Sequence, residues 1–245
     1  MPTTPDPPDS SDRKVAVVTG ASRGIGLGLV DAYRGLGYAV VATSRTIAPS
    51  PDPDVVTVPG DITDPATADR VITAGIEAFG RVDTLVNNAG VFLGKPFTDY
   101  TRDDYDAAVG VNLTGFFRIT QLAVTRMLAQ GGGGHIVQIS TSMVDHANSA
   151  VPSVLASLTK GGLQAATRSL AIEYAARGIR CNAVALGVIR TPMHGEEEYA
   201  GLAQLHPLGR MGEVSDVVEA IVYLENAPFV TGEILHVDGG QNAGH

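Results

Sequence analysis

The sequence feature with the clearest chemistry is a glycine-rich loop directly after an apolar run. Residues 15–18 lead into Thr19-Gly20-Ala21-Ser22-Arg23-Gly24-Ile25-Gly26, and the helix-compatible residues 27–32 follow. A strand, a glycine turn and a helix start together present backbone N–H groups and the positive end of a helix dipole to a phosphate. The loop alone also suits a plain strand-to-helix connection. Its place after the first strand predicts a dinucleotide site instead, in which glycines allow close backbone approach to the pyrophosphate.

The residues after the second apolar run indicate which dinucleotide is bound. A carboxylate there binds the ribose 2′-hydroxyl of NAD, whereas a cation accommodates the 2′-phosphate of NADP. The sequence has Thr43-Ser44-Arg45-Thr46, and no acid follows until Asp52. Arg45 and Arg23 each offer a guanidinium group, which suits bidentate contacts with phosphate. We therefore predict NADP(H) rather than NAD(H); the alternative is two solvated surface arginines.

The elements that position this loop are short β-branched runs alternating with helix-length segments. Near-continuous apolar strands alternating with helices predict a parallel sheet covered on both faces. No linker divides the chain, so we expect one α/β domain over residues 13–245, after a disordered Pro- and Asp-rich tail over residues 1–12. The predicted strands are 15–18, 39–42, 55–58, 84–86, 135–139, 181–185 and 234–237, and the predicted helical segments include 64–79, 103–129, 157–177 and 213–225.

Composition excludes several functional classes. The formal net charge is −9, which argues against a protein that tracks nucleic-acid phosphates. We find no uninterrupted apolar stretch of about 18 residues and no signal peptide, so we expect a cytoplasmic protein that does not engage a membrane. Cys181 is the single cysteine, which excludes an internal disulfide and a multi-thiolate metal site. The histidines do not show metal-ligand spacing, and we predict no metal.

Taken together, the motifs resemble those of the short-chain dehydrogenase/reductase family from about Lys14 to Gly240. This resemblance implies a Rossmann-like, doubly wound, seven-stranded parallel sheet with helices on both faces. It also implies hydride transfer between a nicotinamide cofactor and a small carbonyl or alcohol substrate. The matching segments beyond the glycine loop are Gly60-Asp61-Ile62, Asn87-Asn88-Ala89-Gly90, Val111-Asn112-Leu113-Thr114-Gly115, Leu158-Thr159-Lys160-Gly161-Gly162, Pro207-Leu208-Gly209-Arg210 and Val237-Asp238-Gly239-Gly240.

The resemblance also implies which residues hold the cofactor. In the family, the acid at the position of Asp61 contacts the adenine amine, and the lysine at the position of Lys160 holds the nicotinamide ribose. The implied cofactor-binding residues are Gly20, Ser22, Arg23, Gly24, Ile25, Gly26, Ser44, Arg45, Asp61, Ile62, Asn88, Ala89, Gly90, Lys160, Ile189 and Thr191.

The chain departs from the family at its proton donor. The family places a tyrosine four residues before the lysine, on one helix face, where the lysine lowers the phenol pKa from about 10. In this sequence Ala156 stands four residues before Lys160, and no tyrosine occurs between Tyr105 and Tyr174. An alanine methyl group neither donates nor accepts a proton.

The remaining candidate catalytic residues surround that gap. The resemblance assigns Lys160, the substrate-orienting hydroxyl of Thr141 with Ser142 beside it, and Asn112, which supports a relay water. His146 is the candidate substitute proton donor because histidine titrates near neutrality; a solvent-facing loop histidine is the alternative. Weaker candidates are Asp145, a water held by Asn112 and Thr141, and Tyr199 in a lid over about residues 192–205. Leu186-Gly187 replaces the usual Pro-Gly beside the nicotinamide.

Three functions fit these observations. The first is an NADP(H)-dependent oxidoreductase with a replaced proton donor. The second is a nucleotide-binding sensor or partner subunit without redox activity, and the third is a non-redox enzyme such as a dehydratase or hydrolase. The apolar stripes of 103–129 and 157–177 exceed what is needed to cover a sheet, so we predict a homodimer or homotetramer.

Overall fold

The computed structural model describes residues 13–244, so the predicted tail lies outside the described residues. These residues form one seven-stranded sheet in the order β3-β2-β1-β4-β5-β6-β7, and all its strand pairs are parallel. The predicted doubly wound parallel sheet and single domain are therefore confirmed. The strands are β1 (Val15–Thr19), β2 (Ala39–Ser44), β3 (Val55–Pro59), β4 (Thr84–Asn87), β5 (Gly134–Thr141), β6 (Ile179–Leu186) and β7 (Ile234–Val237).

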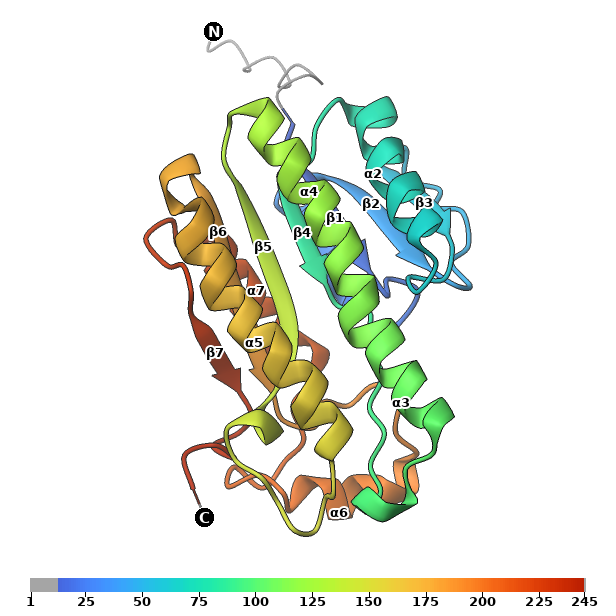
Figure 1. The fold of residues 1–245 in the computed structure, drawn as a ribbon, viewed down its shortest axis with the longest axis vertical. Coiled ribbons are helices and arrows are strands. Elements are labelled where there is room, and N and C mark those ends of the chain that lie inside the picture. Colours follow the sequence, from blue (N-terminus) through green and yellow to red (C-terminus); the bar gives the residue numbers. More distant parts are fainter. Residues whose placement is uncertain (1–12, 245) are drawn as a thin grey trace, which may run out of the picture.

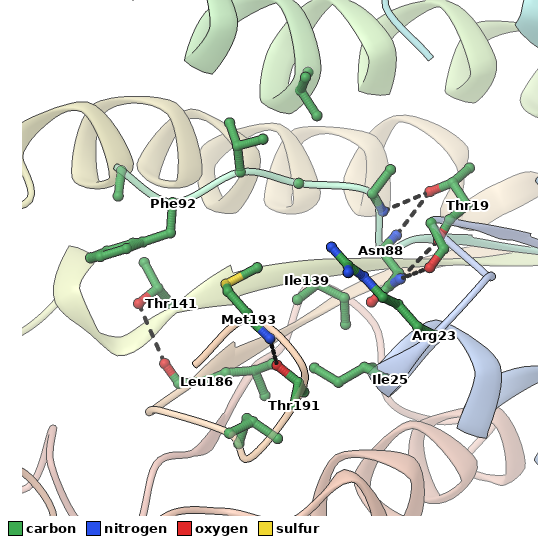
Figure 2. A pocket seen from close by; sticks show the side chains of 18 of the residues that line it. Thr19, Arg23, Ile25, Asn88, Phe92, Ile139, Thr141, Leu186, Thr191 and Met193 are labelled. Carbon is green, nitrogen blue, oxygen red and sulfur yellow. Dashed lines mark hydrogen bonds between the residues drawn. The ribbon is translucent and has the colours of Figure 1, made fainter. Parts of the chain in front are cut away.

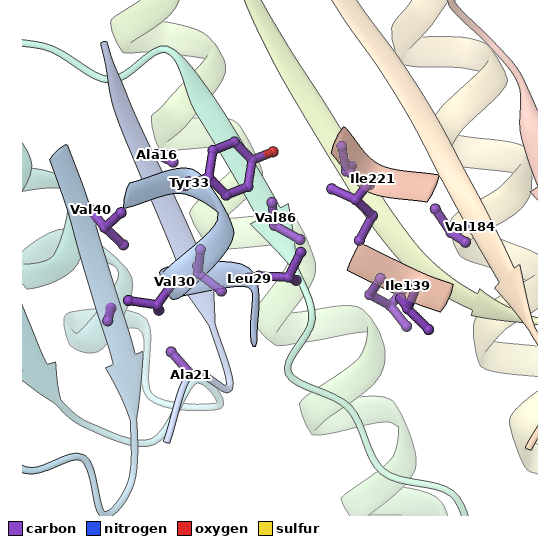
Figure 3. Close-up of a cluster of buried hydrophobic side chains, with 14 of the residues drawn as sticks. Ala16, Ala21, Leu29, Val30, Tyr33, Val40, Val86, Ile139, Val184 and Ile221 are labelled. Atoms are coloured by element: carbon purple, nitrogen blue, oxygen red, sulfur yellow. The ribbon is translucent and has the colours of Figure 1, made fainter. Parts of the chain in front are cut away.

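Helices cover both faces of this sheet. Figure 1 shows α2, α4 and α5 in front of the strands, with α7 behind them. Side chains of α1 and α7, such as Leu29 and Ile221, form one buried cluster with alternate residues of the central strands (Figure 3). Side chains of α2, α4 and α5 form the second cluster on the opposite face. The helices are α1 (Gly24–Gly35), α2 (Pro65–Phe79), α3 (Arg102–Val109), α4 (Phe116–Gln130), α5 (Val154–Tyr174), α6 (Tyr199–Ala203) and α7 (Val214–Asn226).

Local sequence signals explain where several helices begin and end. The Asp64 side chain accepts a hydrogen bond from Ala66 N–H at 3.0 Å, and Pro65 occupies the first helical turn of α2. Gly80 ends this helix with φ of 78°, and Gly131 ends α4 with φ of 72°. Both glycines adopt the left-handed conformation that residues with a Cβ disfavour. Gly131, the first residue of the glycine run 131–134, therefore marks the end of α4.

The segment predicted as one helix over 103–129 contains an interruption. A π-helical turn (Gly110–Gly115) joins α3 to α4. By length and a mean hydropathy of 1.2, the continuous helix Arg102–Gln130 also meets the criteria for a membrane-crossing helix, as buried core helices often do. In this fold it packs against α2, α5 and the sheet. Core packing therefore accounts for part of its apolar surface, since 39% of the apolar window is buried.

The sheet order creates the position of the site. The chain leaves β1 toward β2 and β3 on one side, and then crosses to β4 on the other. In doubly wound sheets, a crevice forms at the carboxyl ends of the strands where the order reverses, and ligands bind there. The segment that contains α6 lies at this end of the molecule (Figure 1).

Candidate cofactor and active site

A cavity of about 820 Å³ lies at the carboxyl ends of β1, β2, β4, β5 and β6. Figure 2 shows Thr19, Arg23 and Asn88 at one end of it and Phe92, Thr141 and Met193 toward the other. This elongated arrangement gives the cavity a polar end next to the glycine loop and a more apolar end below the lid segment. Such a mixture suits a long ligand with a charged part and a small second ligand beside it.

The glycine loop has the geometry of a phosphate cradle. Gly20 and Gly24 have φ of +67° and +55°, and α1 begins at Gly24, so its first N–H groups face the cavity end. A Cβ on Gly26 would collide with the carbonyl oxygen of Gly20. Asn88 braces the loop, because its Nδ2 donates to the carbonyl oxygens of Thr19 at 2.8 Å and Gly20 at 3.1 Å.

Polar groups at the end of β2 surround the place predicted for the adenosine part of the cofactor. Ser44, Arg45 and Asp61 line the cavity, and the Ser44 Oγ is buried without a hydrogen-bond partner among residues 13–244. The N–H and hydroxyl of Thr63 donate to the Asp61 carboxylate at 2.9 and 2.8 Å and lower its pKa. A buried hydroxyl without a partner, on a residue that lines the cavity together with Arg23 and Arg45, indicates a place for a polar ligand group.

Lys160 lines the cavity away from the glycine loop, near Thr141. Its Nζ donates to the Ile139 carbonyl oxygen at 2.7 Å, and burial lowers the lysine pKa to about 8. Glycine at position 90 makes room for the ammonium group, since a Cβ there would lie 2.9 Å from Nζ. The lysine is therefore held at a defined depth below the cavity surface.

Ala156 lies one helical turn before Lys160 on α5 and also lines the cavity. Its methyl group is only 3% exposed. Thr141 lines the cavity from the end of β5, and its hydroxyl lies 3.4 Å from the Leu186 carbonyl oxygen. The structure thus brings Lys160, Thr141 and Ala156 together at one place, as predicted from the motif spacing.

Almost all of the predicted cofactor residues line the cavity. The exception is Gly26, which packs beneath the glycine loop. The predicted residues that line the cavity are Gly20, Ser22, Arg23, Gly24, Ile25, Ser44, Arg45, Asp61, Ile62, Asn88, Ala89, Gly90, Lys160, Ile189 and Thr191.

Three predicted catalytic residues do not line the cavity. Asn112 is buried in the π-helical turn, where its amide pairs with the backbone of Val91 at 2.9 and 3.1 Å. The hydroxyl of Ser142 lies 2.8 Å from the Gln241 Oε1 and is fully buried. His146 does not line the cavity, because the 3₁₀ turn after Thr141 carries it away. His146 as a proton donor is therefore a prediction that the geometry does not support.

The weaker acid candidates are also engaged elsewhere. The Asp145 carboxylate contacts Gln164 at 3.1 Å and His236 at 3.2 Å. Tyr199 does not line the cavity, and the Arg190 guanidinium lies 5.1 Å from its ring centroid. Both side chains stabilise the surroundings of the site. Neither is placed to exchange a proton with a substrate in this conformation.

Sequence reasoning missed several cavity residues. His194 lies within the predicted lid segment, and Leu202 and Leu205 of that segment also line the cavity. Gln241 comes from the C-terminal turn, and its Nε2 is buried without a hydrogen-bond partner among the described residues. The lid motif could have pointed to His194. Nothing in the local pattern around Gln241 indicates that the chain end returns to the cavity.

Comparison with known proteins agrees with this geometry. A family model described as enoyl-(acyl carrier protein) reductase matches residues 20–242. The chain belongs to the short-chain dehydrogenase/reductase family. Among curated family members, the chain is 36% identical over 247 residues to an L-rhamnose 1-dehydrogenase (NAD(P)(+)) from Azotobacter vinelandii, covering 93% of this chain and 96% of that protein. It is also 36% identical over 237 residues to an L-xylulose reductase from Bos taurus, covering 92% and 95%.

Solved structures in the family show the same fold. ElxO with NADP bound matches with a TM-score of 0.87 and 29% identity, covering 95% of this chain and 100% of that chain. A 3-ketoacyl-(acyl-carrier-protein) reductase from Brucella melitensis complexed with NADH matches with a TM-score of 0.85 and 28% identity, covering 96% and 100%. The predicted family and its oxidoreductase character are confirmed at this level. Among residues 13–244, no group of His, Cys, Asp or Glu side chains is arranged to hold a metal ion.

Proposed function

We propose that the protein is an NADP(H)-dependent oxidoreductase acting on a small carbonyl or alcohol substrate with a proton donor other than tyrosine. The observation that carries this proposal is one cavity that joins the glycine cradle at Gly20 to Lys160 and Thr141. A bound nicotinamide supplies or accepts the hydride, and the protein orients the substrate and exchanges a proton with it.

The preference for NADP(H) rests on charge at the end of β2. Arg23 and Arg45 line this part of the cavity with the unpartnered hydroxyl of Ser44, and together they suit a 2′-phosphate. Asp61 also lines this end of the cavity, but its carboxylate already accepts two hydrogen bonds from Thr63. No carboxylate lies at the end of β2 to select a 2′-hydroxyl, because the chain continues there with Arg45 and Thr46.

The proton source in this proposal is the Lys160 ammonium group. Its Nζ keeps one hydrogen bond to Ile139, and an ammonium has further N–H donors for a substrate oxygen or an intervening water. Its pKa of about 8 suits reversible proton exchange near neutral pH. Because Ala156 lines the cavity one helical turn before Lys160 and has no phenol, the ammonium acts without one in this proposal. Thr141 orients the substrate oxygen.

The second candidate function is nucleotide binding without redox activity. The specific observation that favours it is the buried methyl group of Ala156 at the position where the family has its tyrosine. Loss of a general acid lowers the rate by about 10²–10⁴-fold. A protein that binds NADP(H) tightly and turns over no carbonyl compound would fit the role of a sensor or partner subunit.

Cofactor titration and Ala156→Tyr separate these functions. We expect NADPH to bind more tightly than NADH, and a panel of aldehydes and ketones to give slow NADPH oxidation. Ala156→Tyr should raise that rate by about 10²–10⁴-fold, because it restores the phenol above Lys160. Ala78→Tyr, at an exposed position of α2 and outside α4 and α5, is the matched control and should change nothing. If the protein binds NADPH but does not oxidise it with any carbonyl compound, the sensor function is favoured. If it converts a substrate without added nucleotide, a non-redox enzyme is favoured. If it binds neither NADPH nor NADH, the proposed function is overturned.

We also infer that the protein forms a homodimer or homotetramer through α4 and α5. These helices lie side by side on the outer face of the molecule (Figure 1), where Phe117 and Ile172 are 64% and 79% exposed. Large exposed apolar side chains on the same face of the sheet favour an interaction surface there. Phe117→Glu with Ile172→Glu should yield monomers in analytical ultracentrifugation, whereas Phe229→Glu, at an exposed position outside α4 and α5, should not. Unchanged assembly of the double variant would contradict this interface. The cytoplasmic location stays a prediction.

A further inference from the structure

The segment that follows β6 separates two cavities. Gly187, Val188 and Ile189 line the cofactor cavity on one side and a second cavity of about 370 Å³ on the other. The Val188 carbonyl oxygen accepts a hydrogen bond from Gly212 N–H at 3.0 Å, and the Val188 N–H donates to the Nε2 of His206 at 2.9 Å. A histidine side chain therefore holds the backbone of the wall that faces the predicted nicotinamide site.

His206 lies between this wall and the end of the lid segment. The residue immediately follows Leu205, which lines the cofactor cavity, and its ring is only 3% exposed. Its surroundings leave space for glycine alone at two positions: a Cβ on Gly187 would lie 2.6 Å from Nε2, and one on Gly239 would lie 3.1 Å from the histidine Cβ. Movement of this ring would therefore move the wall, the lid end or both.

The hydrogen bond from Val188 defines the protonation state of the ring. A nitrogen that accepts an N–H bond carries no proton, so His206 is neutral with its proton on Nδ1. Burial lowers the His206 pKa below its ordinary value of 6.5, against the opposing effects of the Ala203 and Leu202 backbone carbonyls and the Asp238 carboxylate. Arg210 lowers it further. The second cavity beside the ring also contains His236 from β7 and Asp216 and Glu219 from α7.

We propose that His206 is a positioning residue that holds the Val188–Ile189 wall in its cofactor-binding form and releases it when the ring takes up a second proton. A protonated ring carries N–H groups on both nitrogens, so Nε2–H and Val188 N–H become two donors facing each other. The hydrogen bond is then lost, and cofactor affinity falls in acid. This inference rests on the proposed cofactor binding.

The test is the dissociation constant of NADP⁺ between pH 8 and pH 5, measured by calorimetry on the full chain. His206→Gln is the key variant, because its Oε1 accepts the Val188 N–H and does not titrate. Between pH 8 and pH 5, the NADP⁺ dissociation constant of the wild type should rise about five- to tenfold more than that of His206→Gln. This factor corresponds to the free energy of one hydrogen bond. NAD⁺ serves as a second probe, because it lacks the 2′-phosphate that titrates by itself. His236→Gln, in the same second cavity but bonded to Asp145, is the matched control and should behave as the wild type.

A second measurement needs no variant. In ¹H–¹⁵N spectra, the Val188 amide and the His206 ring should titrate with one midpoint, and NADP⁺ should shift that midpoint to lower pH by reciprocal linkage. Parallel pH profiles of the wild type and His206→Gln, both binding at pH 8, would overturn the inference, as would a Val188 amide that ignores the ring. Absence of NADP⁺ and NAD⁺ binding by the wild type at pH 8 would instead overturn the proposed function and with it this inference.

Discussion

The two ends of the sheet contain buried polar side chains with opposite properties. At the amino end, the Glu225 carboxylate accepts hydrogen bonds from Tyr33 at 3.1 Å, Tyr38 at 2.9 Å and Thr84 at 3.1 Å. The Nδ1 of His135 lies 2.9 Å from the same carboxylate. These residues come from α1, the residue before β2, β4, β5 and α7, so one carboxylate joins the sheet to the helix layer that α1 and α7 form.

At the carboxyl end, comparable polar groups lack partners. The Ser44 Oγ and the Gln241 Nε2 are buried without a hydrogen bond to any residue of the described part of the chain. The Thr141 hydroxyl has only long contacts, because it lies 3.4 Å from the Leu186 carbonyl oxygen and accepts from the Met143 N–H at 3.3 Å. Buried polar groups are normally satisfied, and those that are not deserve a functional explanation. We infer from this contrast that the satisfied network at the amino end stabilises the fold, whereas the unsatisfied groups at the carboxyl end serve the proposed cofactor site.

The pKa values of the buried charged groups at the two ends of the sheet also differ. Burial raises the pKa of Glu225, but hydrogen bonds from His135, Tyr38 and Tyr33 outweigh it and lower the pKa to about 2. Burial likewise lowers the pKa of Lys160 to about 8, and no carboxylate opposes that effect. The Glu225 carboxylate at the amino end therefore has several hydrogen-bond donors, whereas the Lys160 ammonium at the carboxyl end has one carbonyl acceptor and no carboxylate partner.

The largest expected effect comes from removing the centre of the satisfied network. Glu225→Ala leaves several buried donors without an acceptor, and we expect it to lower the free energy of unfolding by about 3–5 kcal/mol. Urea denaturation measures this change. Glu77→Ala, at an exposed position of α2, should stay within about 0.5 kcal/mol of the wild type. A loss below about 1 kcal/mol for Glu225→Ala would show that the network is not what stabilises the amino end.

Acid should weaken the amino end in two pH windows. The pKa of the buried His135 lies below 6.5 in the folded protein, so the unfolded chain takes up protons first and stability falls as the pH drops below about 6.5. The Glu225 contribution is complete above the ordinary pKa of 4.5 and is lost as the pH falls toward about 2. Together we expect a loss of about 2–3 kcal/mol, measured by urea denaturation at a series of pH values. Glu225→Gln should abolish the lower window; persistence of that window would assign it to other carboxylates.

Lys160→Met tests the carboxyl end with the opposite sign. Replacing an unpaired buried ammonium by an apolar side chain of similar length should raise the free energy of unfolding by about 1 kcal/mol while abolishing substrate turnover. Thermal unfolding of the variant measures the first effect and a cofactor-oxidation assay the second. A destabilised variant would indicate that the hydrogen bond to Ile139 matters more for the fold than the cost of burying the charge.

The smallest expected effect on stability is at Ser44. Because its hydroxyl has no partner among residues 13–244, Ser44→Ala should change the free energy of unfolding by less than about 0.5 kcal/mol. It should nevertheless weaken NADPH binding several-fold, because the hydroxyl contacts the bound nucleotide in the proposed function. Thr57→Ala, on the neighbouring β3, is a control for cofactor binding. Equal NADPH affinity for wild type and Ser44→Ala would remove Ser44 from the cofactor site.

Much of the cavity could be predicted because its signals are local. Gly20 and Gly24 require conformations that favour glycine, and the runs around 15–18 and 39–42 have the continuous apolar pattern of strands buried on both faces. Parallel strands in a doubly wound sheet end at one edge. Motifs at the ends of separate strands therefore meet there even when they are far apart in the chain.

The misassigned residues share a different property. Thr141, Ser142 and His146 stand within six residues of each other, yet only Thr141 lines the cavity. The 3₁₀ turn after β5 decides which hydroxyl faces inward, and one residue of difference in a turn reverses a side chain's direction. Ser142 then pairs with Gln241, which is 99 residues away in sequence.

The alternation of strands and helices, the glycine loop and the lack of a tyrosine between Tyr105 and Tyr174 can be read from the sequence alone, because each depends on neighbouring residues. Only the tertiary structure decided that Glu225 gathers side chains up to 192 residues away, that His206 supports Val188 and that Gln241 reaches the cavity. The physical reason is that hydrogen bonds between distant elements depend on how layers pack, and this packing sets side-chain directions that no local pattern records.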